Sequence, residues 1–193
     1  TAIGRVAGFS TSDGEYNTYL GASAGYYQAT GDNNTYVGTH AGFGATGENN
    51  SNNTAVGKSA LYAITTGVSN VAVGSGAGDS LTDGASNVII GKEAGNATTS
   101  ALHTVIIGKG AANGNLTGSG GAEGTIAIGY AALQALTSGI GNVAIGYQAL
   151  DAEDDGDYNT AVGYNALTAQ TGTSGTVKNT AVGYGSMGAI TTG

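Results

Sequence analysis

Five carboxylates crowd one short segment of this 193-residue sequence. They are Asp151, Glu153, Asp154, Asp155 and Asp157. Hard oxygen ligands at close spacing are the kind that hold Ca²⁺. The calcium-binding nonapeptide of toxin repeats is absent, so we favour a solvated acidic loop and keep Ca²⁺ as the alternative. We predict no other cofactor.

Four tyrosines recur at nearly regular intervals toward the end of the sequence: Tyr130, Tyr147, Tyr164 and Tyr184. If each belongs to one turn of a repeat, their rings can stack on one another. An aromatic ladder that stabilises the fold is the interpretation we favour. A sugar-binding platform is the alternative.

Other patterns that could carry chemistry are weaker. The segment 183–188 matches Gly-x-Gly-x-x-Gly, but a dinucleotide site needs a helix next and an acidic residue about 20 residues on. His40 and His103 stand far apart, and cysteine is absent, which argues against a metal site or a nucleophile–base pair. We therefore predict that the chain is not an enzyme.

A glycine repeat fills the sequence and must position all of these residues. Seven of the ten intervals between its glycines are 17 residues, and the other three are 19, 21 and 20. A fixed period with small insertions predicts a solenoid, in which each repeat is one coil stacked on its neighbours. The eleven coils, in a single array over residues 1–193, are centred on Gly4, Gly21, Gly38, Gly57, Gly74, Gly91, Gly108, Gly129, Gly146, Gly163 and Gly183.

Composition narrows the class further. Only 9% of residues are charged and 40% are hydrophobic, so there is a core to bury. Glycine reaches 37 residues without a Gly-X-Y period, which excludes collagen. Proline is absent, as a continuous backbone ladder requires. The net charge of −8 and five scattered bases argue against nucleic acid, and no apolar run is long enough to span a membrane.

Three positions before each repeat glycine define a strand. Numbering the glycine as column 0, column −1 is always aliphatic and column −3 holds Thr, Val or Ile from the second repeat on. We place both columns inside the coil. This placement, and the interruption of column −3 from Val71 to Val143, argue against an exposed ice-binding array of Thr18, Thr35 and Thr54. Column −2 then points outward without a single charge, which predicts a contact with another chain. This predicted oligomer interface comprises Tyr19, Tyr36, Ala55, Ala72, Ile89, Ile106, Ala127, Ala144, Ala161 and Ala181.

The remaining columns describe a thin coil. Column +3 is Ala in ten repeats and Ser186 in the last, as expected where a larger side chain would overpack. Column −4 is mostly Asn, which favours turns and can form a ladder of amides. Three enlarged loops cover 47–52, 114–124 and 171–178. Neither end carries a cap, so we expect a fragment of a longer fibre or rods that join end to end.

Two stretches carry a family resemblance. Asn142–Leu150 reads NVAIGYQAL and Asn159–Leu167 reads NTAVGYNAL. Both resemble the repeats of trimeric autotransporter adhesin heads and the similar repeats of phage tail fibres, although adhesin-head repeats are typically nearer 14 residues. The resemblance implies a left-handed parallel β-roll, three chains around one axis and a role in attachment.

The sequence thus predicts an all-β protein: a parallel β-solenoid (left-handed β-roll) of about eleven 17-residue coils, assembled as a homotrimer. We expect a structural, adhesive fibre segment at a cell surface or on a virion, with no catalysis. Two alternatives stay open. One is a glycan- or Ca²⁺-binding module, which would give the chain a cell-surface or glycan receptor. The other is a monomeric solenoid that stacks into a fibril.

Overall fold

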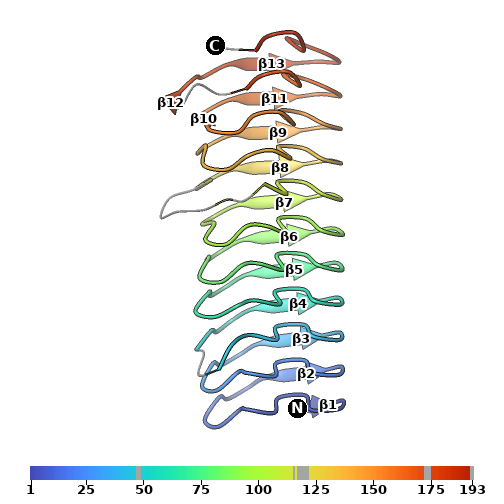
Figure 1. The fold of residues 1–193 in the computed structure, drawn as a ribbon, viewed down its shortest axis with the longest axis vertical. Helices are drawn as coiled ribbons and strands as arrows, with labels where there is room; N and C mark the ends of the chain where they lie inside the picture. Colours follow the sequence, from blue (N-terminus) through green and yellow to red (C-terminus); the bar gives the residue numbers. More distant parts are fainter. Residues whose placement is uncertain (47–48, 115, 117–121, 172–174, 192–193) are drawn as a thin grey trace.

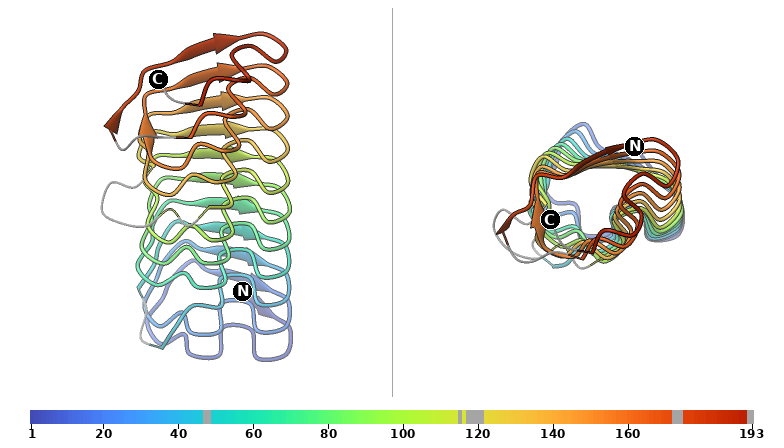
Figure 2. Two further views of the ribbon diagram at one scale, coloured as in Figure 1. Left: turned by 45° about the horizontal axis from the view of Figure 1, so that its top comes forward. Right: turned by 90° about the horizontal axis from the view of Figure 1, so that it is seen from above.

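The computed structural model describes residues 1–46, 49–114, 116, 122–171 and 175–191. These residues form a parallel β-solenoid of about ten turns, and none of them is helical. Each turn adds one short strand to an eleven-stranded sheet in the order β1-β2-β3-β4-β5-β6-β7-β8-β9-β11-β13 (Figure 1). Viewed along the rod, successive coils superpose into one ring (Figure 2).

All eleven strands of the sheet end at the residue before a repeat glycine. They are β1 (Ala2–Ile3), β2 (Thr18–Leu20), β3 (Thr35–Val37), β4 (Thr54–Val56), β5 (Val71–Val73), β6 (Val88–Ile90), β7 (Val105–Ile107), β8 (Ile126–Ile128), β9 (Val143–Ile145), β11 (Thr160–Val162) and β13 (Thr180–Val182). A separate pair, β10 (Gly156–Asp157) and β12 (Gly175–Thr176), joins two neighbouring loops in parallel.

The register of the sheet confirms the glycine repeat. Val56 pairs with Val73, and Val73 pairs with Ile90, so equivalent residues lie directly above one another. The insertions between repeats therefore enter the loops and leave the strands aligned. The strands are rich in β-branched residues, which favour the extended conformation. Parallel hydrogen-bonded pairing joins the strands into one ladder.

The repeat glycines allow the coils to approach closely. Gly74, for example, has a φ of +137°, and a Cβ added there would lie 2.5 Å from the carbonyl oxygen of Gly91 in the next coil. Only glycine tolerates both this dihedral angle and this contact. The glycine is thus required by the stacking itself.

The interior of the coil differs from the sequence prediction. Column −2, predicted to face outward, is buried in every coil from β2 onward, whereas columns −3 and −1 point away from the core. Column −2 packs against the alanines of column +3 and the larger residues of column +4. Column −2, which ranges from Ala to Tyr, fills the interior of the coil, and the two aliphatic columns remain outside.

Side-chain size is matched across this core. Column +4 is Gly where column −2 is Tyr: a Cβ on Gly25 would lie 2.5 Å from Tyr19 Cε1. Each column −2 residue lies against column +4 of its own coil and of the preceding one, since Gly8 also abuts Tyr19. Where column +4 becomes Leu, as at Leu150, column −2 returns to Ala, as at Ala144. In most coils one of the two columns is large and the other small. The coil of Gly74 is the exception, with Ala72 and Gly78, and there Leu61 and Ile89 of the adjacent coils lie over Gly78.

Four consecutive asparagines of column −4, Asn34, Asn53, Asn70 and Asn87, form the predicted amide ladder inside the coil. Asn70 Nδ2 donates to Asn53 Oδ1 at 3.1 Å and to the carbonyl of Gly84 at 2.8 Å. Asn70 Oδ1 in turn accepts from Nδ2 of Asn87 at 2.9 Å. Because these amides are buried, each must find partners within the protein, and the neighbouring coils supply them.

Candidate interaction surfaces

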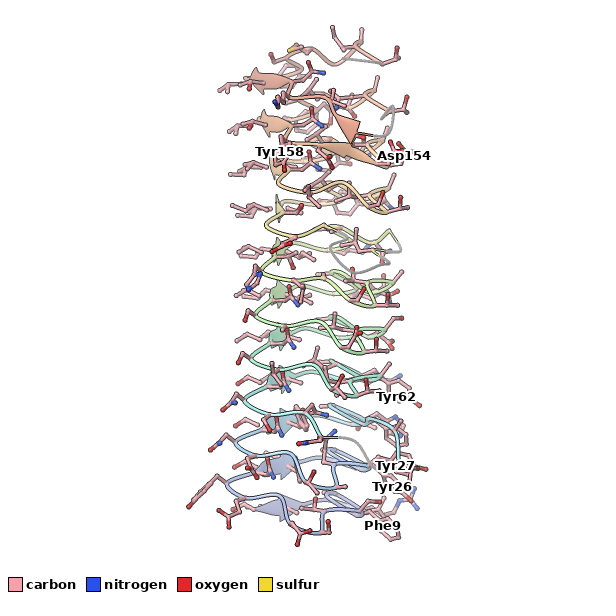
Figure 3. The ribbon with its side chains drawn as sticks, turned by 90° about the vertical axis from the view of Figure 1, so that its left-hand side faces the viewer. Phe9, Tyr26, Tyr27, Tyr62, Asp154 and Tyr158 are labelled. Atoms are coloured by element: carbon pink, nitrogen blue, oxygen red, sulfur yellow. The ribbon has the colours of Figure 1, made fainter. Side chains whose placement is uncertain are left out.

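The outer side of the sheet is an aliphatic face. It consists of columns −3 and −1, which hold Thr, Val, Ile and Leu and no charged residue. In the central coils, away from both ends of the rod, Val73, Ile90 and Ile145 expose 36%, 36% and 37% of their surface. In Figure 3 the strands are seen end-on toward the left side, and a row of side chains projects beyond them. We name these two columns the aliphatic face.

This geometry corrects the predicted oligomer interface. Tyr19, Tyr36, Ala55, Ala72, Ile89, Ile106, Ala127, Ala144, Ala161 and Ala181 lie in the chain's own core and present no surface to a partner. It also removes one objection to a threonine array, since Thr18 and Thr35 are exposed. Valine still interrupts that column from β5 through β7, so the surface is mainly aliphatic.

The C-terminal tyrosines form a continuous ladder. The ring centroids of Tyr130, Tyr147, Tyr164 and Tyr184 lie 5.0, 4.8 and 5.4 Å apart, with interplanar angles of 16°, 7° and 13°. Lys109 Nζ adds a cation–π contact 5.7 Å from the Tyr130 centroid. Because each ring covers the face of its neighbour, the interior rings have no free face for a sugar. The geometry therefore favours the stabilising ladder over the sugar-binding platform.

A second group of aromatic rings was not singled out by the sequence patterns. Phe9, Tyr26, Phe43 and Tyr62 occupy column +5 of the first four coils and stack at 5.0, 5.2 and 5.0 Å. Tyr27 and His40 stand nearly perpendicular beside them. We name these six residues the N-terminal aromatic cluster. Aligning column +5 would have found the ladder, but nothing in the sequence indicates how Tyr27 and His40 are turned.

The acidic loop brings part of the predicted carboxylate group together. Glu153, Asp154 and Asp155 each offer an oxygen within 4.8 Å of the others. Asp157, however, accepts a hydrogen bond from the Ile140 amide at 2.9 Å, and Asp151 accepts from the Thr168 hydroxyl at 2.7 Å. Two of the five predicted ligands thus hold neighbouring coils.

Glu153 is the only one of the five carboxylates that is fully buried, and hydrogen-bond donors already occupy it. Its Oε1 accepts from the amides of Gly156 at 2.7 Å and Asp155 at 3.3 Å, and its Oε2 accepts from Gln170 Nε2. Burial, followed by the charges of Asp154, Glu153 and Asp157, raises the pKa of Asp155. The loop is therefore a structural network whose carboxylates repel one another. One oxygen, Asp155 Oδ1, is buried without a hydrogen-bond partner among the described residues.

The remaining candidate patterns do not form a site. Residues 184–189 form turns after β13, so the helix that a dinucleotide fingerprint requires is absent at this point. His40 contacts Phe43 and Tyr62, whereas His103 faces Glu123 at 3.6 Å, four coils farther along the rod. The two histidines therefore cannot act together.

Comparison with known proteins places this chain in no family: no family model, no curated protein and no solved structure matches it. The resemblance to adhesin-head and tail-fibre repeats thus remains a prediction. None of the described residues belongs to a helix capable of crossing a membrane. The fold itself defines the class, which is a parallel β-solenoid with an aliphatic sheet face.

Proposed function

We propose that this chain is a segment of a structural, adhesive fibre, at a cell surface or on a virion, in which three copies pack their aliphatic faces around a common axis. The uncharged aliphatic face is the observation that carries this proposal. The number of chains and a left-handed winding are taken from the family resemblance. Catalysis has no part in the proposal.

The size of the aliphatic face supports self-association. If each of its side chains exposes about 50 Å², the face as a whole offers on the order of 1,000 Å². Exposed apolar patches of monomeric proteins rarely exceed a few hundred Å². A stable interface buries roughly 800 Å² on each partner, and flat sheet faces pack well against one another. A second and third copy of the same rod would match the length and regular spacing of this face.

The rest of the molecule suits a fibre. The core holds alanine, leucine and asparagine ladders that repeat from coil to coil, so stability accumulates with length. The loops opposite the sheet vary in sequence and would face outward from a bundle joined through the aliphatic faces. Attachment would then occur through these loops.

Two adjacent substitutions test the proposal. Ile145 belongs to the aliphatic face and Ala144 to the core. Ile145→Glu should leave the coil folded, with its unfolding free energy within about 1 kcal/mol, but dissociate the oligomer by placing carboxylates at the interface. Ala144→Glu should instead destabilise each chain by several kcal/mol, because it buries an unpaired charge.

The measurement is molar mass by light scattering during gel filtration, with circular dichroism to follow folding. We expect the unsubstituted chain at three times its own mass and Ile145→Glu at one. A monomer at about 100 µM, far above the dissociation constants of stable oligomers, would refute the proposal. An open-ended filament would refute it in favour of end-to-end stacking.

A further inference from the structure

We propose that the N-terminal aromatic cluster binds a neutral saccharide, with a hexopyranose ring packed on the outward face of Tyr27. This inference rests on the adhesive function proposed above and names the class of its receptor. It places the sugar site at the opposite end of the rod from the C-terminal tyrosines, which were the sequence-based candidates.

The position of the cluster keeps it accessible in an assembly. Phe9, Tyr26, Tyr27 and Tyr62 lie along the right side of the rod in Figure 3, opposite the strands. Packing of the aliphatic faces would therefore leave the cluster on the outside. Phe9 and Tyr62 expose 65% and 37% of their surface, and the other four members are partly exposed.

The orientation of Tyr27 distinguishes it from the stacked rings. Its centroid lies 4.5 Å from that of Tyr26 and 5.2 Å from that of Phe43, at interplanar angles of 75° and 87°. Tyr26 and Phe43 are themselves stacked 5.2 Å apart, which leaves no slot for a ring to enter edge-first. Tyr27 must therefore lay one face across the edges of both rings, and its other face is turned away from the ladder.

The residues that occupy the position of Tyr27 in the adjacent coils do not carry bulky side chains. The equivalent positions in the preceding and following coils are Ser10 and Gly44, both small. Tyr26, Tyr27 and Tyr62 carry phenol hydroxyls and His40 an imidazole, so the cluster contains hydrogen-bonding groups. The six members carry no carboxylate, lysine or arginine, but Asp79 occupies column +5 in the coil that follows Tyr62.

These features match the chemistry of a hexopyranose. One face of such a ring carries C–H groups that pack on an aromatic ring, while its hydroxyls point sideways and can pair with polar groups at the rim. A single outward ring is the size of one sugar residue and too small to anchor a protein interface of standard area. The carboxylate of Asp79 at the end of this column and the lack of a lysine or arginine in the cluster favour a neutral sugar over a sialylated or phosphorylated one.

The C-terminal ladder supplies the matched control. Tyr147 is stacked on both faces, by Tyr130 and Tyr164, and among the described residues no ring stands perpendicular to it as Tyr27 does to Tyr26. The two sites therefore contain the same residue type on the same solenoid. They differ in that Tyr27 has an outward ring face and Tyr147 has none. Removing Tyr27 should affect sugar binding, and removing Tyr147 should not.

The experiment applies the intact chain to a printed array of neutral oligosaccharides and titrates it in solution with lactose and cellobiose. We expect retention of β-linked hexosides, and an affinity about tenfold weaker in Tyr27→Ala. Tyr147→Ala should bind like the unsubstituted chain. Tyr27→Phe keeps the ring face, so it should stay within about threefold and exclude a folding defect as the cause.

The inference is overturned if no neutral sugar is retained, or if Tyr27→Ala binds as well as the unsubstituted chain. Light scattering on the same samples separates this failure from that of the proposed function. A trimer that retains no sugar would remove only the receptor assignment. A monomer whose sugar binding depends on Tyr27 would remove only the assembly.

Discussion

The matching of side-chain size across the core can be tested by transferring one coil's packing to the next. Ile106 in column −2 lies against Gly95 and Ala112 in column +4, whereas Ala127, one coil later, is paired with Leu133. Replacing the pair Ala127 and Leu133 by the residue types of Ile106 and Ala112 gives the double variant Ala127→Ile with Leu133→Ala. All four residues of the two pairs are fully buried, so the substitutions act on the core alone.

The magnitudes follow from the volumes exchanged. Ala127→Ile alone should overpack the coil and cost about 2 kcal/mol. Leu133→Ala alone should leave a cavity and cost about 3 kcal/mol. The double variant conserves the total number of carbon atoms and approximates the environment of Ile106, with Ala112 in the place that Gly95 has beside Ile106, so it should cost about 1 kcal/mol. The coupling energy is then about 4 kcal/mol in favour of the pair.

Urea unfolding followed by circular dichroism measures all three variants. A control pairs Ala127→Ile with Leu167→Ala, two coils away, where the single effects should simply add. If the Ala127–Leu133 pair is also additive, at about 5 kcal/mol, the two columns do not share one space. The assignment of column −2 to the core would then be wrong.

Three further predictions concern the backbone and the buried polar groups. Gly74→Ala should lower the unfolding free energy by at least about 3 kcal/mol in urea titration, while Gly110→Ala, where an added Cβ meets nothing within 4 Å, should cost only about 1 kcal/mol. Asn70→Ala should cost about 2 to 3 kcal/mol in the same assay, because the buried carbonyl of Gly84 and the buried backbone amide of Asn87 lose the side chain with which they pair. Burial raises the pKa of Tyr36 well above its ordinary value, so above about pH 10 the unfolded chain releases this proton and the folded chain does not. Stability should therefore fall as the pH rises beyond that point, and a pH series of melting temperatures should show a shallower fall for Tyr36→Phe.

The glycine period predicted the architecture because each coil repeats the same backbone requirement. The stacking of Val56, Val73 and Ile90 and the amide ladder of column −4 were both predicted from residue spacing, and the structure confirms them. These features depend on local conformation and on identical neighbours. The spacing of residues along the sequence was therefore sufficient to predict both the stacked strands and the amide ladder.

The sidedness of the strands was predicted wrongly, for a physical reason. Alternation shows that columns −3 and −1 share one side and column −2 the other, but both sides are apolar here. Hydrophobicity could not decide between them. The inverse sizes of columns −2 and +4, as in Tyr19 with Gly25 and Ala144 with Leu150, were the signal that could have done so.

The sequence by itself determined the solenoid, its register, and the columns of glycine, alanine and asparagine, because these follow from backbone geometry repeated at a fixed period. Only the tertiary structure decided which apolar column is enclosed and how the aromatic rings are turned. Closure of the coil sets the width of the core, and rings from different coils meet only once the coils are stacked. Both potential interaction surfaces, the aliphatic face and Tyr27, arise at that level.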